Sequence, residues 1–345
     1  RMKINELVRE NIRNMQPYSC ARSEFKGEAS VYLDANENPY NSPFNRYPDP
    51  LQTELKKEIS KIKKVPVENI FLGNGSDEAI DLLYRAFCEP KIHNVVAIEP
   101  SYGMYRVCAE INNVEYRPVL LDENFDVEAY KLMDASNDKT KIIWLCSPNN
   151  PTGNSLNFSE INKLLSWFRG IVVIDEAYID FSTKKSLLNY LTLFPQLIVL
   201  QTMSKAWGNA GIRLGMAFAD PEIIGILNKI KYPYNINYLT QQHALQALQN
   251  PEQVEKWVAL ILEEKEKLIK ELQKLKLVEK IYPSDANFIL VKVENANAIY
   301  RFLIQNGIVV RNRSNMPLCN NCIRITVGTP EENKALIDTL KKFHV

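Results

Sequence analysis

Residues 197–215, "LIVLQTMSKAWGNAGIRLG", join an apolar run of strand length to a lysine that stands among small residues. The run shows little polar alternation, which is typical of a strand buried on both faces of a sheet. Lys205 follows this run, and Arg213 lies eight residues further on. Small residues surround the lysine: Ala206, Gly208, Ala210, Gly211 and Gly215. A solvated lysine needs no small neighbours, whereas a lysine beside a flat ligand that lies against the backbone does.

Similar apolar runs occur earlier in the chain, at 94–98, 141–146 and 171–175. Between them, residues 103–111 and 158–168 have the apolar spacing of helices. This alternation predicts an α/β fold with a mostly parallel sheet flanked by helices. Such sheets bind ligands beyond the carboxyl ends of their strands.

The chain has 345 residues, which exceeds the length that a single hydrophobic core usually supports. We expect an N-terminal arm over 1–45, a large domain over 46–255 and a small α+β domain over 256–345. A long amphipathic helix beginning at Pro251 marks the change of pattern, and strand-like segments at 286–293, 308–310 and 322–327 follow it. We expect the arm to pack with the small domain and with a partner subunit.

The composition argues against several classes of partner. The 42 Lys and Arg residues balance 41 Asp and Glu residues, so no long-range field attracts nucleic acid or a membrane surface. No apolar run approaches the roughly 18 residues that a spanning helix needs. The six cysteines are scattered, as expected for reduced thiols in a cytoplasmic protein. The "CNNC" of 319–322 lacks a second ligand pair, so we expect no metal.

Polar residues at the ends of these runs suit imine chemistry. A lysine that attacks a carbonyl must be partly desolvated or near other cations, and Arg213 could lower the pKa of Lys205. Asp175 ends a buried run, where it needs a cation or a strong donor. Tyr178 and Asn150 add a phenol and an amide.

The glycine-rich turn "LGNGSDEAI" (72–80) runs into a predicted helix with Ser76 and Asp77 at its start. A helix N-terminus binds anions, most often phosphate. Ser76 is also a good N-cap residue, so capping alone is the alternative. A phosphate site, a lysine, a buried acid, a phenol and an amide together suit pyridoxal 5′-phosphate.

Several motifs occur in the order that a known family shows. The chain resembles the fold-type I pyridoxal-phosphate aminotransferases over essentially its whole length, and within them the histidinol-phosphate aminotransferases. The resemblance rests on "LDANENPY", "RYPDP", "GNGSDEAID", "PSYGMY", "SPNNPTG", "VIDEAYIDF", "TMSKAWGNAGIRLG" and "CIRITVGT".

The resemblance implies a role for each matching residue. Lys205 would bind the cofactor as a Schiff base and then carry the proton, and Asp175 would keep the pyridine nitrogen protonated. Tyr178 and Asn150 would bond the phenolate oxygen. The ring would lie between Tyr102 and Ala177. The phosphate would be held by Ser76, Asp77, Thr202, Ser204 and Arg213, and by Tyr47 from the neighbouring subunit of a homodimer with shared active sites.

The resemblance also implies a substrate site. Arg324, in the otherwise apolar "CIRITV", matches the arginine that binds a substrate carboxylate, and burying it without an anion would be costly. The remaining substrate-binding candidates are Tyr18, Asn36 and Arg311. Two alternatives stay open: Arg313 could replace Arg311 as the phosphate ligand, and Arg22 could be either a ligand or a surface residue.

The implied reaction moves an amino group between L-histidinol phosphate and 2-oxoglutarate, giving imidazole-acetol phosphate and L-glutamate, in histidine biosynthesis. Aromatic or broad-specificity transamination, or phospho-amino-acid decarboxylation on the same fold, are alternatives. A ligand-sensing module is a further one, but it would need a basic DNA-binding segment that the short, neutral arm does not supply.

Overall fold

The computed structural model describes residues 3–344, and its centre is a seven-stranded sheet in the order β1-β7-β6-β5-β4-β2-β3. The strands are β1 (Ile70–Asn74), β2 (Asn94–Glu99), β3 (Glu115–Leu120), β4 (Thr140–Cys146), β5 (Ile171–Asp175), β6 (Leu197–Thr202) and β7 (Leu214–Phe218). Strand β7 is antiparallel to its neighbours β1 and β6, and the other pairs are parallel. The predicted α/β class with a mostly parallel sheet is confirmed.

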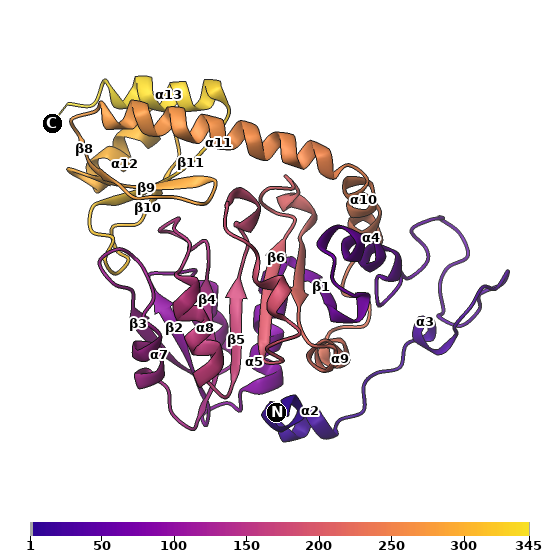
Figure 1. Cartoon of the computed structure of the whole chain (residues 1–345). Coiled ribbons are helices and arrows are strands. Elements are labelled where there is room, and N and C mark those ends of the chain that lie inside the picture. Colours follow the sequence, from indigo (N-terminus) through magenta and orange to yellow (C-terminus); the bar gives the residue numbers. More distant parts are fainter. Residues whose placement is uncertain (1–2, 345) are drawn as a thin grey trace.

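The continuous apolar runs form strands because both faces of the sheet are covered by helices (Figure 1). In β4, Ile142 and Trp144 enter one core, while Ile143 and Leu145 enter the other. The first core is covered by α5 (Gly75–Phe87), α6 (Met104–Ile111) and α9 (Pro221–Ile230). The second is covered by α4 (Thr53–Lys63), α7 (Ala129–Ala135), α8 (Phe158–Trp167) and α10 (Tyr238–Leu248).

A smaller domain lies over the carboxyl ends of the parallel strands (Figure 1). Its antiparallel sheet has the order β10-β11-β9-β8. Its elements are β8 (Val278–Ile281), β9 (Phe288–Val293), α12 (Ala296–Gln305), β10 (Arg311–Asn312), β11 (Cys322–Thr326) and α13 (Pro330–Leu340). The strand expected at 308–310 begins only at Arg311, because the ladder with β11 starts at the pair Arg311 and Arg324.

Helix α11 (Pro251–Gln273) runs from the large domain to the small one, so the expected boundary between 255 and 256 falls inside this helix. Its outer face is polar, with Lys267 pairing with Glu263 at 3.2 Å. Within residues 3–344, no helix combines the length and the apolar character that crossing a membrane requires.

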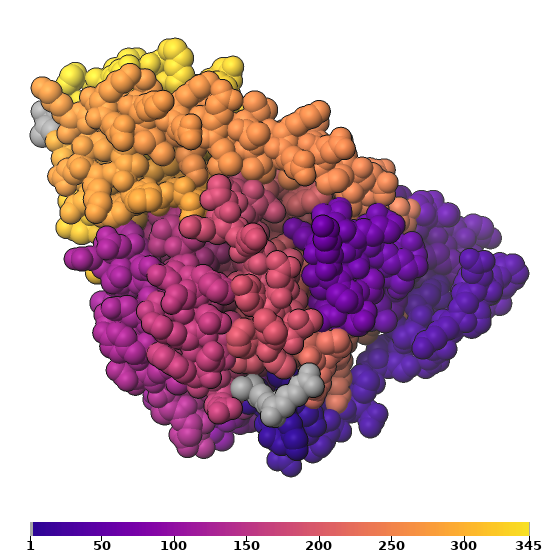
Figure 2. Space-filling model, in the orientation of Figure 1, coloured from indigo at the N-terminus to yellow at the C-terminus, as the bar shows by residue number. Residues whose placement is uncertain are grey.

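The arm begins with the short helices α1 (Ile4–Leu7), α2 (Glu10–Asn14) and α3 (Ala21–Glu24). Its first part packs on the large domain, where Ile4, Val8 and Ile12 enter the same core as α5 and α9. The Arg9 amide donates to Ala86 O at 2.9 Å. The expectation that this part packs with the small domain is wrong, because its apolar positions, four residues apart, form one stripe that the large domain buries. The rest of the arm, which the structure extends to residue 51 just before α4, then runs outward as a lobe at the edge of the molecule (Figure 2).

Candidate active site

The carboxyl ends of β2, β4, β5 and β6 meet at one edge of the large sheet, below the small domain. A cavity of about 520 Å³ lies there, walled by the loops after these strands, the start of α5 and the β10–β11 segment. Most of the predicted site residues line it: Ser76, Asp77, Tyr102, Asn150, Asp175, Ala177, Tyr178, Thr202, Ser204, Lys205, Arg213, Arg311 and Arg324. The fold therefore brings together residues spread over 249 positions of the chain, from 76 to 324.

One end of the cavity is built to bind an anion. Helix α5 begins at Gly75, whose φ is +68°, and a Cβ there would lie 2.4 Å from Arg213 Nη2. The N-cap residue is Asn74, and its side chain makes no capping hydrogen bond. Ser76 therefore lies in the first turn and does not act as the cap. The first-turn amides and the Arg213 guanidinium, which donates to Ser204 Oγ at 3.4 Å, form a phosphate-sized set of donors.

Lys205 lies in a partly desolvated and cationic environment. Its ammonium nitrogen is 5.6 Å from the centre of the Tyr178 ring. Burial lowers the pKa of Lys205, and the positive charges of Arg324 and then Arg213 lower it further. The effect expected of Arg213 thus comes more strongly from Arg324. The amine is neutral at a lower pH than that of an ordinary lysine, as attack on an aldehyde requires.

Asp175, 3% exposed, is held by two donors. Tyr105 Oη donates to its Oδ2 at 2.6 Å, and the Ala177 amide donates to its Oδ1 at 3.1 Å. Burial raises the pKa of Asp175 to about 6, although both hydrogen bonds oppose the shift. An acid held in this way can pair with a protonated ring nitrogen. The sequence prediction did not include Tyr105, although it is the second tyrosine of "PSYGMY" and lies on the buried face of α6.

Two further contacts refine the predicted roles. Tyr102 Oη donates to Asp77 Oδ1 at 2.9 Å, so the Asp77 carboxylate is engaged by a phenol. Because like charges repel, Asp77 could contact a phosphate only through its backbone amide. Asn150 Nδ2 lies 3.5 Å from Tyr178 Oη, to which it donates.

Arginines of the small domain form the opposite wall. Arg324 Nη1 donates to Asn150 Oδ1, and Arg311 is the cross-strand partner of Arg324. Both alternatives for the second arginine, Arg311 and Arg313, line the cavity. The Arg324 side chain is half-buried, and this burial lowers its pKa.

Three predicted residues lie outside this cavity within the protomer. Tyr18 and Asn36 are exposed on the arm. Tyr47 is half exposed, and its ring stacks on Tyr234 with centroids 4.4 Å apart. Arg22 is ion-paired within the arm, at 2.7 Å from Asp34 Oδ1, and does not line the cavity.

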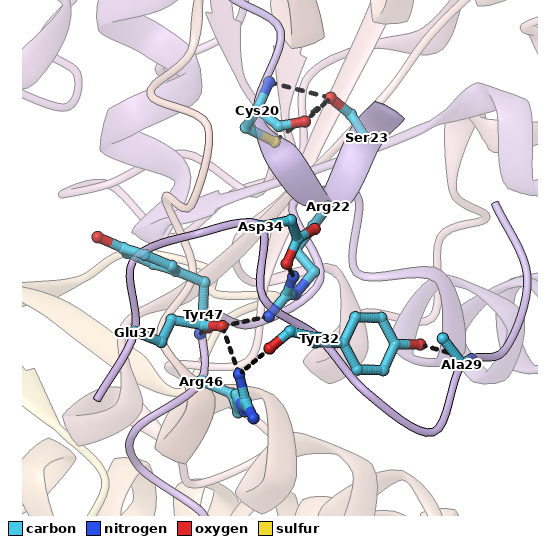
Figure 3. A network of polar contacts seen from close by, with 9 residues as sticks. All are labelled: Cys20, Arg22, Ser23, Ala29, Tyr32, Asp34, Glu37, Arg46 and Tyr47. Carbon is cyan, nitrogen blue, oxygen red and sulfur yellow. Dashed lines mark hydrogen bonds and ion pairs between the residues drawn. The ribbon is translucent and has the colours of Figure 1, made fainter. Parts of the chain in front are cut away.

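The arm is organised around the carboxylate of Glu37, whose side chain is only 2% exposed (Figure 3). Glu37 Oε1 accepts from Arg22 at 2.5 Å and from Arg46 at 2.9 Å. Glu37 Oε2 accepts from the Tyr47 amide at 2.6 Å. The arm is therefore an ordered structure that holds the backbone of Tyr47 in place.

A mostly parallel sheet under a small domain, with a desolvated lysine, a buried acid and a helix N-terminus around one cavity, is the arrangement of an enzyme that uses pyridoxal 5′-phosphate. The model for aminotransferase class I and II matches residues 26–340, and the chain belongs to this family.

Relatives and solved structures agree with this assignment. The histidinol-phosphate aminotransferase of Bacteroides thetaiotaomicron is 60% identical over 341 residues, with 99% of each chain covered. That of Parabacteroides distasonis is 59% identical over 340 residues, again with 99% of each chain covered. The crystal structure of the histidinol-phosphate aminotransferase from Clostridium acetobutylicum superposes with a TM-score of 0.80 at 26% identity, covering 86% of this chain and 90% of that one.

Proposed function

We propose that this enzyme transfers the amino group of L-histidinol phosphate to 2-oxoglutarate, giving imidazole-acetol phosphate and L-glutamate, in histidine biosynthesis. The observation that carries this proposal is the arginine wall facing Lys205 across the cavity. The amino donor bears a phosphate and no carboxylate, whereas the acceptor bears two carboxylates. A cluster of guanidinium groups can pair with either kind of anion, because it matches planar and tetrahedral oxyanions alike. The names of the relatives that are about 60% identical support the same donor.

The cofactor supplies an aldehyde carbon and an electron-withdrawing ring. On this proposal, Lys205 would hold the cofactor through its aldehyde carbon and would carry the proton of the substrate's amino carbon. Asp175, which Tyr105 and the Ala177 amide orient, would hold a proton on the ring nitrogen. Asn150 and Tyr178 would bond the ring oxygen, and Tyr102 and Ala177 would flank the ring. The phosphate would be held by the first turn of α5 together with Thr202, Ser204 and Arg213.

We further propose that the enzyme is a homodimer in which the arm of one subunit completes the cavity of the other. Tyr18, Asn36 and Tyr47 would act in this way. The arm carries large apolar side chains that the protomer leaves exposed: Met15, Tyr18, Phe25, Val31, Leu33, Tyr40, Phe44, Tyr47 and Leu51. Leu33, for example, is 90% exposed. An apolar surface of this kind is typical of a subunit interface.

A cytoplasmic location is part of the same proposal. All six cysteines of the chain have free thiols in the structure, and all are buried. Free thiols are typical of the reducing compartments in which amino acids are made.

The test is to add L-histidinol phosphate, with no oxo acid, to the purified enzyme loaded with pyridoxal 5′-phosphate. The visible absorbance band of the bound cofactor should disappear, and one imidazole-acetol phosphate should form per active site. Lys205→Ala is the control: it should bind cofactor non-covalently and form no product. A band that responds only to aromatic amino acids or L-glutamate would contradict the donor but leave the cofactor assignment intact.

A further inference from the structure

The segment that joins β10 to β11 carries Arg313 into the wall of the active-site cavity. Its backbone is tightly folded: the Arg313 amide donates to Cys322 O at 2.9 Å, and the Met316 amide donates to Arg313 O at 2.9 Å. Cys319 and Cys322 anchor the segment in the core, where both are fully buried. Arg313 and Met316 therefore face the cavity from a fixed frame.

The guanidinium of Arg313 is held by neutral groups. Its Nε donates to Asn312 O at 3.1 Å, and its Nη1 faces the Met316 sulfur at 3.5 Å. Throughout residues 3–344, no carboxylate comes within ion-pair distance of it. Burial lowers the pKa of Arg313, and the charges of Arg311 and Arg324 lower it further. A half-buried cation beside two like charges is costly unless an anion joins them.

The positive charges around the cavity exceed what the cofactor and the two carboxylates of 2-oxoglutarate require. Five cationic side chains line it: Lys205, Arg213, Arg311, Arg313 and Arg324. The carboxylates that line it, Asp77 and Asp175, are already engaged by Tyr102 and Tyr105. Lys205 and Arg213 serve the cofactor on the proposed function. Three guanidinium groups then remain for the substrate, whereas the two carboxylates of 2-oxoglutarate need only two arginines if each is bound in a bidentate manner.

A phosphate group on the amino donor explains this surplus of positive charge. It offers three acceptor oxygens and carries nearly two negative charges at neutral pH. We propose that Arg313 is a specificity-determining residue that pairs with the phosphoryl group of the amino donor. This inference rests on the proposed function. Arg324, which is held by Asn150, serves both substrates, whereas Arg313 serves the phosphorylated one.

The test compares three amino donors on the wild-type holoenzyme and on Arg313→Gln: L-histidinol phosphate, L-histidinol and L-glutamate. The rate of loss of the visible band is measured at several concentrations of each donor, which gives kcat/KM for that half-reaction. Losing one charge-assisted hydrogen bond should lower kcat/KM for L-histidinol phosphate about ten- to a hundredfold. The value for L-histidinol should change less than about threefold, because this donor lacks the phosphoryl group that Arg313 contacts.

Two further variants sharpen the comparison. Arg313→Lys keeps the charge but loses the planar fork, so it should recover part of the preference for the phosphorylated donor. Arg301→Gln changes an exposed arginine of α12 and should leave all three donors unaffected.

Each outcome is decisive. Equal losses for all three donors would mean that Arg313 is only structural, and a loss confined to L-glutamate would assign it to the distal carboxylate; either result overturns the inference. A wild-type enzyme that does not respond to L-histidinol phosphate would overturn the proposed function itself, which no result with Arg313→Gln alone can do.

Discussion

The burial of Asp175 serves the active site but lowers the stability of the folded protein at neutral pH. The site needs a buried acid at the end of β5, and that burial raises its pKa to about 6. In the unfolded chain the pKa of an aspartate is about 3.9. The folded, cofactor-free protein therefore holds this proton more tightly than the unfolded chain does. The stability that this provides is fully present below about pH 3.9 and is lost as the pH rises through about 6.

Asp175→Asn should remove this pH dependence. Asparagine has no charge to bury, and Tyr105 Oη can accept from its amide as well as donate. The free energy of unfolding of the cofactor-free variant, relative to wild type, should rise between pH 5 and 8 by about 1–1.5 kcal/mol. Urea unfolding across this range measures it. A difference that stays constant with pH would show that Asp175 does not titrate there.

At the scale of the elements, the anion site depends on how closely α5 approaches β7. A Cβ on Gly215 would lie 2.1 Å from Ser76 N and 2.2 Å from Gly75 C. Both atoms are backbone, so neither can move without displacing the first turn of the helix. A glycine at 215 is therefore required for the helix N-terminus to reach the cavity.

Gly215→Ala should destabilise the protein by about 1–3 kcal/mol and weaken cofactor binding, because the first turn of α5 is displaced. Gly225→Ala is the matched control, since nothing lies within 4 Å of a Cβ at this helical position. That variant should be neutral or slightly stabilising, because alanine favours helix. Thermal unfolding and cofactor titration of both variants provide the measurements. Unchanged cofactor affinity in Gly215→Ala would argue against phosphate binding at α5.

The folded structure of the arm depends on one buried carboxylate, that of Glu37. Glu37→Gln keeps the shape of the side chain but removes the charge that Arg22 and Arg46 share. The free energy of opening of the arm should fall by about 2 kcal/mol, the usual contribution of a charge-assisted hydrogen bond. Hydrogen exchange of residues 20–47 reports this opening. Glu28→Gln, on the exposed part of the same arm, should have no effect; an equal effect of both variants would contradict the role of Glu37.

At the scale of the whole molecule, the cavity belongs to no single domain. Lys205 and Asp175 come from the large domain, Arg324 comes from the small domain, and α11 links the two domains (Figure 1). The arm leaves the body of the protomer, and Tyr47 ends up outside the cavity that it was predicted to join. On the proposed function, a second subunit would bring Tyr47 to the cofactor's phosphate.

Hybrid dimers test this arrangement. Lys205→Ala and Tyr47→Phe should each be impaired, the second through weaker cofactor binding. Mixing and reassociating them should restore one native site in each hybrid dimer, because the Lys205→Ala subunit supplies Tyr47 to the site that retains Lys205. Cofactor affinity and turnover of the purified hybrid are the measurements. If the hybrid binds cofactor as weakly as Tyr47→Phe alone, then Tyr47 acts within its own subunit or not at all.

The sequence by itself determined the α/β class, the buried strands and the residues at their carboxyl ends, including Lys205, Asp175 and Asn150. It could do so because continuous apolar runs specify doubly covered strands, and parallel strands place their ends at one edge. Only the tertiary structure decided that Tyr105 bonds Asp175, that Arg324 acts on Lys205 more strongly than Arg213 does, and that the start of the arm packs on the large domain. These contacts depend on helix rotation, loop course and side-chain direction, which the spacing of residues along the chain does not determine.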